Sequence, residues 1–228
     1  MIEIKDCWLT DKCKKRLKDG KCPEFCIKLF KLNALFDNAL MTDPQRKHVN
    51  LHLDADEKDR SAFEKLRSIE LDIENFVLNG ENIFIYSPIC GNGKTAWSIR
   101  LMQAYFNKIW HKSDISCKGL FINVPRFFLE LKNSISNENE YVNHIKKNVL
   151  DADIVIWDEV ATKSLTVYEH EHLLYMINAR IDAKKSNIYT SNLQPYDLNE
   201  KLGSRLYSRV INNSTVLEFK GSDKRGMN

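Results

Sequence analysis

The chain has 228 residues, of which 43% are hydrophobic and 29% are charged, with 8 Gly and 5 Pro. This composition excludes a collagen-like or wholly disordered chain, and the net charge of +3 does not by itself indicate nucleic-acid binding. No apolar stretch approaches the ~20 residues of a membrane-spanning helix, and the N-terminus lacks the apolar core of a signal peptide. We therefore expect a cytoplasmic protein without a membrane partner.

The first predicted unit, residues 1–35, is a small basic module that carries four of the six cysteines. They have the spacing C-x5-C-x8-C-x3-C: Cys7, Cys13, Cys22 and Cys26. Four thiolates can close a tetrahedral structural zinc site, and so short a segment buries little core of its own. Reduced cysteines in a core are the alternative, as is a mixed site that uses His48 or His52.

Residues 36–80 form a predicted helical connector. Apolar side chains recur there at three- to four-residue spacing, which is typical of an amphipathic helix: Phe63, Leu66, Ile69, Ile73 and Phe76. Glycine is a good stop for such a helix. We therefore expect one continuous helix that ends near Gly80.

After Gly80, apolar runs alternate with helical patterns. Continuous apolar runs between helices are typical of a buried parallel sheet that helices cover on both faces. We expect an α/β domain over residues 81–228 with a five-stranded parallel sheet. The predicted strands are Ile83–Tyr86, Leu120–Val124, Ile154–Trp157, Asn187–Thr190 and Thr215–Phe219.

The strongest motif, SPICGNGKT, follows the first strand and ends at Thr95. A Gly-x-Gly-Lys-Thr loop between a strand and a helix, here predicted from Ala96 to Trp110, is typical of a P-loop. Its backbone N–H groups and the helix N-terminus form a positive concavity for phosphate oxygens. We expect ATP to contact Cys90, Gly91, Asn92, Gly93, Lys94 and Thr95. Lys94 would reach the β- and γ-phosphates, and Thr95 would ligate Mg²⁺.

One position of the loop departs from this motif. Pro88 stands five residues before Gly93, where the motif has its first glycine. Proline fixes φ and lacks an N–H, but this position mainly starts the loop, so we expect an altered start and a working site. A chance turn at the start of a helix is the alternative.

Two carboxylates, Asp158 and Glu159, directly follow the apolar strand Ile154–Trp157. Sites in open α/β sheets lie at the carboxyl ends of the strands, so we expect this pair, a Walker B motif, beside the P-loop. Asp158 would hold the Mg²⁺ shell, and Glu159 would orient the attacking water. A strand end with solvated acidic residues is the alternative.

Three more motifs follow in order: Thr190-Ser191-Asn192-Leu193, the pair Arg205 and Arg209, and a terminal Gly221-Ser222-Asp223-Lys224-Arg225. With the two Walker motifs, this order resembles the AAA+ ATPases and, within them, the DnaC/DnaI-type replicative helicase loaders. The resemblance covers roughly residues 80–228. The Walker motifs are generic, and the later motifs carry the more specific likeness.

The resemblance implies roles for four polar residues. Asn192 corresponds to sensor 1 and Arg225 to the sensor 2 arginine. Arg209 corresponds to the arginine finger, which acts on the ATP of a neighbouring subunit, with Arg205 as the alternative. Salt bridges on a surface helix are the other interpretation of the two arginines. Only 36 residues follow Asn192, too few for a separate helical lid, so the likeness implies self-association in the ATP state.

The segment between the second and third strands is a candidate for DNA contact. Initiator-type relatives carry an extra helix here and use it on single-stranded DNA, and this chain has a second helical pattern from Tyr141 to Leu150. Arg126 and Lys132 are suited to phosphates, since basic grooves follow single strands. A solvated helix face is the alternative. We expect Phe127, Phe128 and Leu131 to lie in the core.

These motifs lead to one functional hypothesis. The chain is expected to be a slow ATPase, using ATP and Mg²⁺ and carrying zinc if the cysteines bind it, that loads a replicative helicase onto single-stranded DNA. DnaI-type loaders have a similar layout, with a small zinc-bearing N-terminal module that binds the helicase. Two alternatives remain open: an IstB-type transposition-helper ATPase, and a non-catalytic adaptor, which Pro88 mildly favours.

Overall fold

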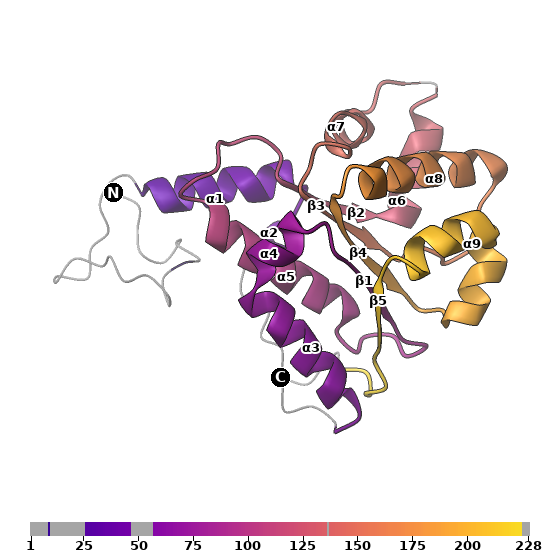
Figure 1. Ribbon diagram of the computed structural model, residues 1–228. Helices are drawn as coiled ribbons and strands as arrows, with labels where there is room; N and C mark the ends of the chain where they lie inside the picture. The colour runs from indigo at the N-terminus through magenta and orange to yellow at the C-terminus, as the bar shows by residue number, and fades with distance from the viewer. Residues whose placement is uncertain (1–8, 10–25, 47–56, 136, 225–228) are drawn as a thin grey trace.

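The computed structural model describes residues 9, 26–46, 57–135 and 137–224. At its centre lies a five-stranded sheet in the order β2-β3-β4-β1-β5 (Figure 1). The strands are β1 (Asn82–Tyr86), β2 (Gly119–Asn123), β3 (Ile154–Asp158), β4 (Ser186–Ser191) and β5 (Thr215–Glu218). Every neighbouring pair is parallel. The predicted α/β class and five parallel strands are therefore confirmed.

Helices cover both faces of this sheet because successive side chains of a strand point to opposite faces. In β1, Ile83 and Ile85 enter one hydrophobic core and Phe84 enters the other. The first core is covered by α1 (Ile27–Asn38), α3 (Arg60–Leu71), α4 (Ile73–Leu78) and α5 (Lys94–Ile109). The second is covered by α6 (Val124–Asn133), α7 (Glu140–Asn148), α8 (Val167–Asp182) and α9 (Pro195–Ile211).

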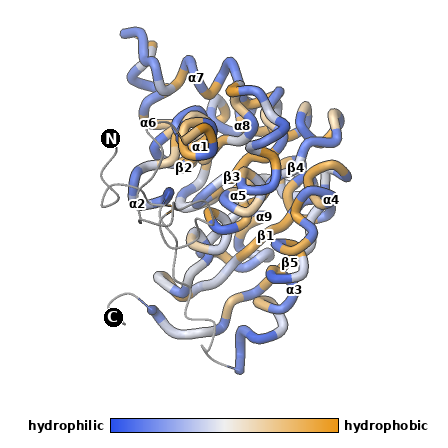
Figure 2. Tube along the Cα trace, turned by 90° about the vertical axis from the view of Figure 1, so that its left-hand side faces the viewer, coloured by the Kyte–Doolittle hydropathy of each residue, from blue (hydrophilic) through white to orange (hydrophobic). Residues whose placement is uncertain are grey.

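The distribution of hydropathy along the chain follows this layering. In Figure 2 the tube of β1 is hydrophobic in colour where it crosses the interior, whereas the peripheral helix α7 is largely hydrophilic. Two short helical segments, α2 (Asp43–Arg46) and a 3₁₀ turn (Glu57–Asp59), complete the elements of the described residues. None of the described helices is long and apolar enough to cross a membrane.

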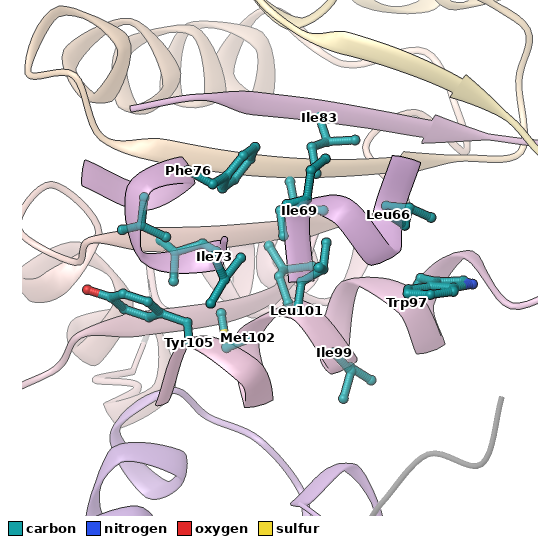
Figure 3. Packing of buried hydrophobic residues seen from close by; sticks show 14 of the residues in the cluster. Leu66, Ile69, Ile73, Phe76, Ile83, Trp97, Ile99, Leu101, Met102 and Tyr105 are labelled. Atoms are coloured by element: carbon teal, nitrogen blue, oxygen red, sulfur yellow. The ribbon is translucent and has the colours of Figure 1, made fainter. Parts of the chain in front are cut away.

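The prediction of one continuous helix up to Gly80 is wrong, because the helix is interrupted at Asp72. This residue has φ −111° and ψ 31°, and it separates α3 from α4. Its carboxylate accepts from the side-chain Nδ2 of Asn75 at 2.8 Å, and aspartate is among the weaker helix formers. The break leaves both segments facing the core: Figure 3 shows Ile73 of α4 beside Met102 of α5.

Gly80 ends α4 as predicted, and only glycine fits there. Its φ is +66°, and an added Cβ would lie 2.4 Å from the backbone oxygen of Lys184. The N–H of Gly80 donates to Val77 O, and the N–H of Glu81 donates to Phe76 O. This pair of bonds closes the helix in a Schellman motif, which turns the chain directly into β1.

Helix α1 packs on the same core as the P-loop helix. Leu32, Leu35 and Phe36 are fully buried, and Phe36 meets Phe106 of α5 edge to face at 5.4 Å. The backbone N–H of Phe121 in β2 donates to Ala39 O at 2.8 Å. The sequence suggests a boundary between two units near residue 35. The chain at this boundary is joined to the sheet both by side-chain packing and by a backbone hydrogen bond.

Arg180 of α8 is buried beneath the starts of β3 and β4. Its guanidinium donates to Asn187 Oδ1 and to three backbone oxygens, those of Val149, Ala152 and Ser186, at 2.5–2.7 Å. Burial lowers its pKa to about 10, so the group stays charged at pH 7. The arginine therefore joins the segments that enter the two strands whose other ends carry the candidate site.

Replacing Arg180 by Met should lower the free energy of unfolding by roughly 3 kcal/mol or more, because three buried carbonyls lose their donor at about 1–3 kcal/mol each. Chemical denaturation of the purified protein measures this change. The matched control is Arg100→Met, since Arg100 pairs with Glu70 at 2.9 Å near the surface, where such pairs contribute about 1 kcal/mol or less. Equal effects of the two substitutions would contradict the buried-network interpretation.

Candidate nucleotide-binding site

The loop from Ser87 to Gly93 joins β1 to α5 in the strand–loop–helix order that the motif predicts. Gly91 has φ +75° and Gly93 has φ +103°, values that glycine adopts without the strain of a side chain. Gly93 is the N-cap residue of α5, which begins at Lys94, two residues before the predicted start. The N–H groups at the start of this helix therefore face the loop, where they suit phosphate oxygens.

Side chains within the loop hold its shape. Asn92 is buried, and its Nδ2 donates to Ser87 Oγ at 2.6 Å and to Phe219 O at 3.4 Å. Lys94 Nζ donates to Ile89 O at 3.1 Å and to Asn92 Oδ1 at 3.3 Å. The side chain of Asn92 thus supports the loop, while Lys94 is positioned over it. Cys90 and Pro88 are both exposed.

The Walker B residues lie beside the loop, as the strand pattern predicts. Thr95 Oγ1 and Thr190 Oγ1 each donate to Asp158 Oδ1 at 2.8 Å. Glu159 follows with φ +59°, and its Oε2 accepts from Asn123 Nδ2 at 3.4 Å. The site therefore brings together the ends of β1, β2, β3 and β4.

The residues of this cluster fit magnesium. A threonine hydroxyl and an aspartate carboxylate are hard oxygen donors, and Mg²⁺ is usually held by one or two such groups together with substrate phosphates. Thr95 and Asp158 would be these groups. Among the described residues, no three His, Cys, Asp or Glu side chains gather to hold a further metal ion.

Asn123 and Thr190 belong to the site, although the sequence motifs assigned a role to neither of them. Asn123 also caps α6, because its Oδ1 accepts from the N–H of Arg126 at 3.1 Å. Each is a polar residue at or near the carboxyl end of a predicted strand, and this is the one signal that could have pointed to them. Their partners become evident only from the order of the strands.

The segment after β5 is held by hydrogen bonds to Asp59 and to the P-loop. Asp59 is fully buried, and its Oδ1 accepts from the N–H groups of Lys220 and Gly221 at 2.6 and 3.0 Å. Further on, the N–H of Lys224 donates to Gly91 O at 3.1 Å, and its Nζ lies 3.8 Å from Asp59 Oδ2. The terminal motif therefore reaches the loop through Lys224. Arg225, the predicted sensor 2 residue, lies outside the described residues.

The other residues predicted to act on the nucleotide lie after β4 and on α9. Asn192 is half-buried and follows Ser191, whose backbone oxygen accepts from the N–H of Ser87 at 3.1 Å. Arg205 and Arg209 are exposed one turn apart on α9. Within the described part of the chain, no ion pair engages either arginine. The alternative that they form surface salt bridges thus gains no support there.

The candidate DNA residues lie on α6. Arg126 and Lys132 are both exposed, and the guanidinium of Arg126 lies 4.5 Å from the ring centre of Tyr141, which links α6 to α7. Burial raises the pKa of the Tyr141 phenol, so the ring stays neutral beneath the cation. Core positions for Phe127, Phe128 and Leu131 are confirmed, since all are at most 3% exposed.

Most residues of the predicted zinc site are not among those that the structure describes. Cys7, Cys13 and Cys22 lie outside the described residues, and so do His48 and His52. Cys26 is half-buried immediately before α1 and is a free thiol.

Comparisons with known proteins agree with this geometry. Residues 67–216 match the family described as the bacterial DnaA ATPase domain. The crystal structure of the DnaC helicase loader is similar at 22% identity, with a TM-score of 0.61 over 76% of this chain and 98% of the other. DnaI is similar at 18% identity, with a TM-score of 0.59 over 81% and 94%.

The replication initiator DnaA bound to AMPPCP and single-stranded DNA is similar at 21% identity, with a TM-score of 0.55 over 72% of this chain and 47% of the other. A search of the curated proteins gave no match. The structural likenesses establish a shared fold, and the family match covers more than half of the sequence. The predicted resemblance is thereby confirmed: the chain belongs to the bacterial DnaA ATPase domain family and has the AAA+ fold of the DnaC and DnaI helicase loaders.

Proposed function

We propose that this protein is an ATP-dependent loader that places a replicative DNA helicase on single-stranded DNA, with ATP binding and hydrolysis as the switch. The observation that carries the proposal is the cluster of Thr95, Asp158 and Glu159 beside the P-loop, which is the arrangement that ATP hydrolysis requires. The DnaC helicase loader shares the fold over nearly its whole length, which favours this role within the family.

Each residue of the site has a separate role in the proposed hydrolysis. The loop N–H groups and Lys94 would bind the phosphates, and Thr95 and Asp158 would hold Mg²⁺, which would neutralise phosphate charge. Glu159 orients the attacking water, and Asn192 acts as sensor 1, which reads the γ-phosphate through its polar side chain. An arginine from α9 of a neighbouring subunit, Arg209 or Arg205, completes the site. ATP would therefore favour assembly of subunits, and its hydrolysis would release them.

We propose that the exposed face of α6 contacts single-stranded DNA through Arg126 and Lys132. Replacing both by Ala should weaken binding and reduce the slope of log affinity against log salt by about 1.4, since each phosphate contact contributes about 0.7 for a single strand. Fluorescence anisotropy with oligo-dT at several salt concentrations measures both quantities. The matched control is Lys65→Ala/Arg67→Ala, which removes the same charges from the exposed face of α3. An unchanged slope in the α6 double variant would remove these residues from the interface.

We further propose that Cys7, Cys13, Cys22 and Cys26 hold one zinc ion in a module that binds the helicase. Elemental analysis of the purified full chain should give about one zinc per chain. Replacing Cys26 by Ser, next to α1, should reduce the zinc content, whereas Cys117→Ser should not, because Cys117 lies by β2 and bonds to Asn38 O and Gly119 O. A metal-free protein that is folded would contradict the proposal.

The experiment that tests the loader assignment is capture from a lysate of the source cell. The bait is the full chain with ATP, together with Glu159→Gln as an ATP-locked form and Lys94→Ala as the nucleotide-free control. Recovery of a replicative helicase with the first two baits alone is the expected result. Recovery of a transposase without helicase would move the protein to the transposition-helper class while its ATPase assignment stands.

A further inference from the structure

The hydroxyl of Thr190 lies between Asp158, the last residue of β3, and the backbone N–H of Glu159, which follows the strand. Its Oγ1 donates to Asp158 Oδ1 at 2.8 Å and accepts from the backbone N–H of Glu159 at 3.0 Å. A hydroxyl has one proton and two lone pairs, so Thr190 donates its only hydroxyl proton in the bond to Asp158. The residue is 1% exposed, which means that bulk water cannot replace these two bonds.

Asp158 receives hydroxyl bonds from two different elements. Thr95 Oγ1, at the start of α5, also donates to Oδ1 at 2.8 Å. The donor on the P-loop side belongs to the nucleotide site itself, whereas Thr190 approaches from β4 and is held by the sheet. If Thr95 held a metal ion, the bond from Thr190 would still hold the carboxylate of Asp158 from the side of the sheet.

Glu159 depends on Thr190 in a second way. Its φ of +59° is strained for a residue with a side chain, and such residues persist only where the surroundings hold them. The N–H of Glu159 donates to Thr190 Oγ1, and the N–H of Val160 donates to Thr190 O at 2.9 Å. Two successive N–H groups of the turn thus bond to one residue.

We propose that Thr190 is a positioning residue for ATP hydrolysis: it orients Asp158 for Mg²⁺ and holds Glu159 where it can orient water. This inference rests on the proposed ATPase function and adds a residue to it. Thr190 acts through the carboxylate of Asp158 and the backbone N–H of Glu159. Its position just before Ser191 and Asn192 also joins the sensor 1 strand to the Walker B strand.

The test compares Thr190→Val, which keeps the branched shape and removes the hydroxyl, with Thr190→Ser, which keeps the hydroxyl and removes a methyl group. Thr190→Val should lower kcat by about 100-fold, the size of effect that misplaced reacting groups produce, with little change in KM for ATP. It should also raise the Mg²⁺ concentration needed for half-maximal turnover. Thr190→Ser should restore most of the rate and the normal Mg²⁺ dependence.

Ser186→Ala is the matched control. Ser186 has a fully buried hydroxyl at the opposite end of the same strand, where it donates to Phe76 O at 3.2 Å. Its loss should lower the melting temperature without changing kcat or the Mg²⁺ dependence. A general weakening of β4 would instead affect the Ser186 and Thr190 variants alike.

Two results would overturn the role of Thr190: normal kcat and Mg²⁺ dependence in Thr190→Val, or an equal loss in Thr190→Ser. Glu159→Gln in the same assay separates this failure from that of the proposed function. If Thr190→Val has normal ATPase activity while Glu159→Gln is inactive, only the role of Thr190 is refuted. If Glu159→Gln is active, the proposed ATPase mechanism itself is wrong. If the wild type turns over too slowly, the gain in affinity for a fluorescent ATP analogue on adding Mg²⁺ is measured, and loss of that gain in Thr190→Val supports the proposal.

Discussion

Glutamine in place of Glu159 is expected to remove most ATP turnover while leaving ATP binding intact. The carboxylate is half-buried at the end of β3, and its Oε2 accepts from Asn123 Nδ2 at 3.4 Å. Glutamine has the same size and keeps an oxygen for that bond, but it cannot accept a proton from water. Loss of such a group costs roughly 100- to 10,000-fold in rate. Phosphate release under saturating ATP, with ATP affinity measured in parallel, gives both quantities.

The control for this substitution is an exposed glutamate on another element. Glu171 on α8 is exposed, and Glu171→Gln should turn over ATP at the wild-type rate. Equal turnover of Glu159→Gln and wild type would remove Glu159 from the mechanism. A loss of ATP binding in Glu159→Gln would instead show that the substitution disturbs the strained turn rather than the chemistry.

Alanine in place of Lys94 is expected to weaken ATP binding by about 100-fold or more. Lys94 is 8% exposed and holds its ammonium over the P-loop through Ile89 O and Asn92 Oδ1. Bonds from a charged donor contribute about 1.5–3 kcal/mol each, and about 2.7 kcal/mol corresponds to a hundredfold change in affinity. Titration with a fluorescent ATP analogue measures the loss.

Lys108→Ala is the matched control for Lys94→Ala. Lys108 lies near the far end of the same helix and is exposed, so its removal deletes one positive charge without touching the loop. ATP affinity should be unchanged in this variant. Similar affinities for Lys94→Ala and wild type, with both proteins folded, would mean that Lys94 does not contact the phosphates.

Local patterns were sufficient to predict the sheet and the central motifs. A strand buried on both faces reads as a continuous apolar run, as in Ile154–Trp157, and the P-loop lies within a single strand–loop–helix unit. The order of the strands was not predictable in this way, because it depends on pairings between distant segments. Asn123, Asp158 and Thr190 meet only because β2, β3 and β4 are neighbours.

Two other features escaped prediction for physical reasons. Asp72 falls inside a continuous amphipathic pattern, so nothing in the spacing of apolar residues signals the break between α3 and α4. Asp59 reads as an ordinary polar residue before a helix, yet it binds the backbone of Lys220 and Gly221, more than 160 residues later. Contacts over such separations follow from the complete fold and leave no local signal in the sequence.

We propose that ATP bound to this chain drives the placement of a helicase on single-stranded DNA. The most direct measurement uses the helicase recovered by capture, circular single-stranded DNA and the purified loader, and counts helicase rings that stay on the circle after a high-salt wash. Stable rings are expected with wild-type protein and ATP, few with Lys94→Ala, and a retained complex of loader, helicase and DNA with Glu159→Gln. Equal numbers of rings with wild type, with Lys94→Ala and without any loader would contradict it.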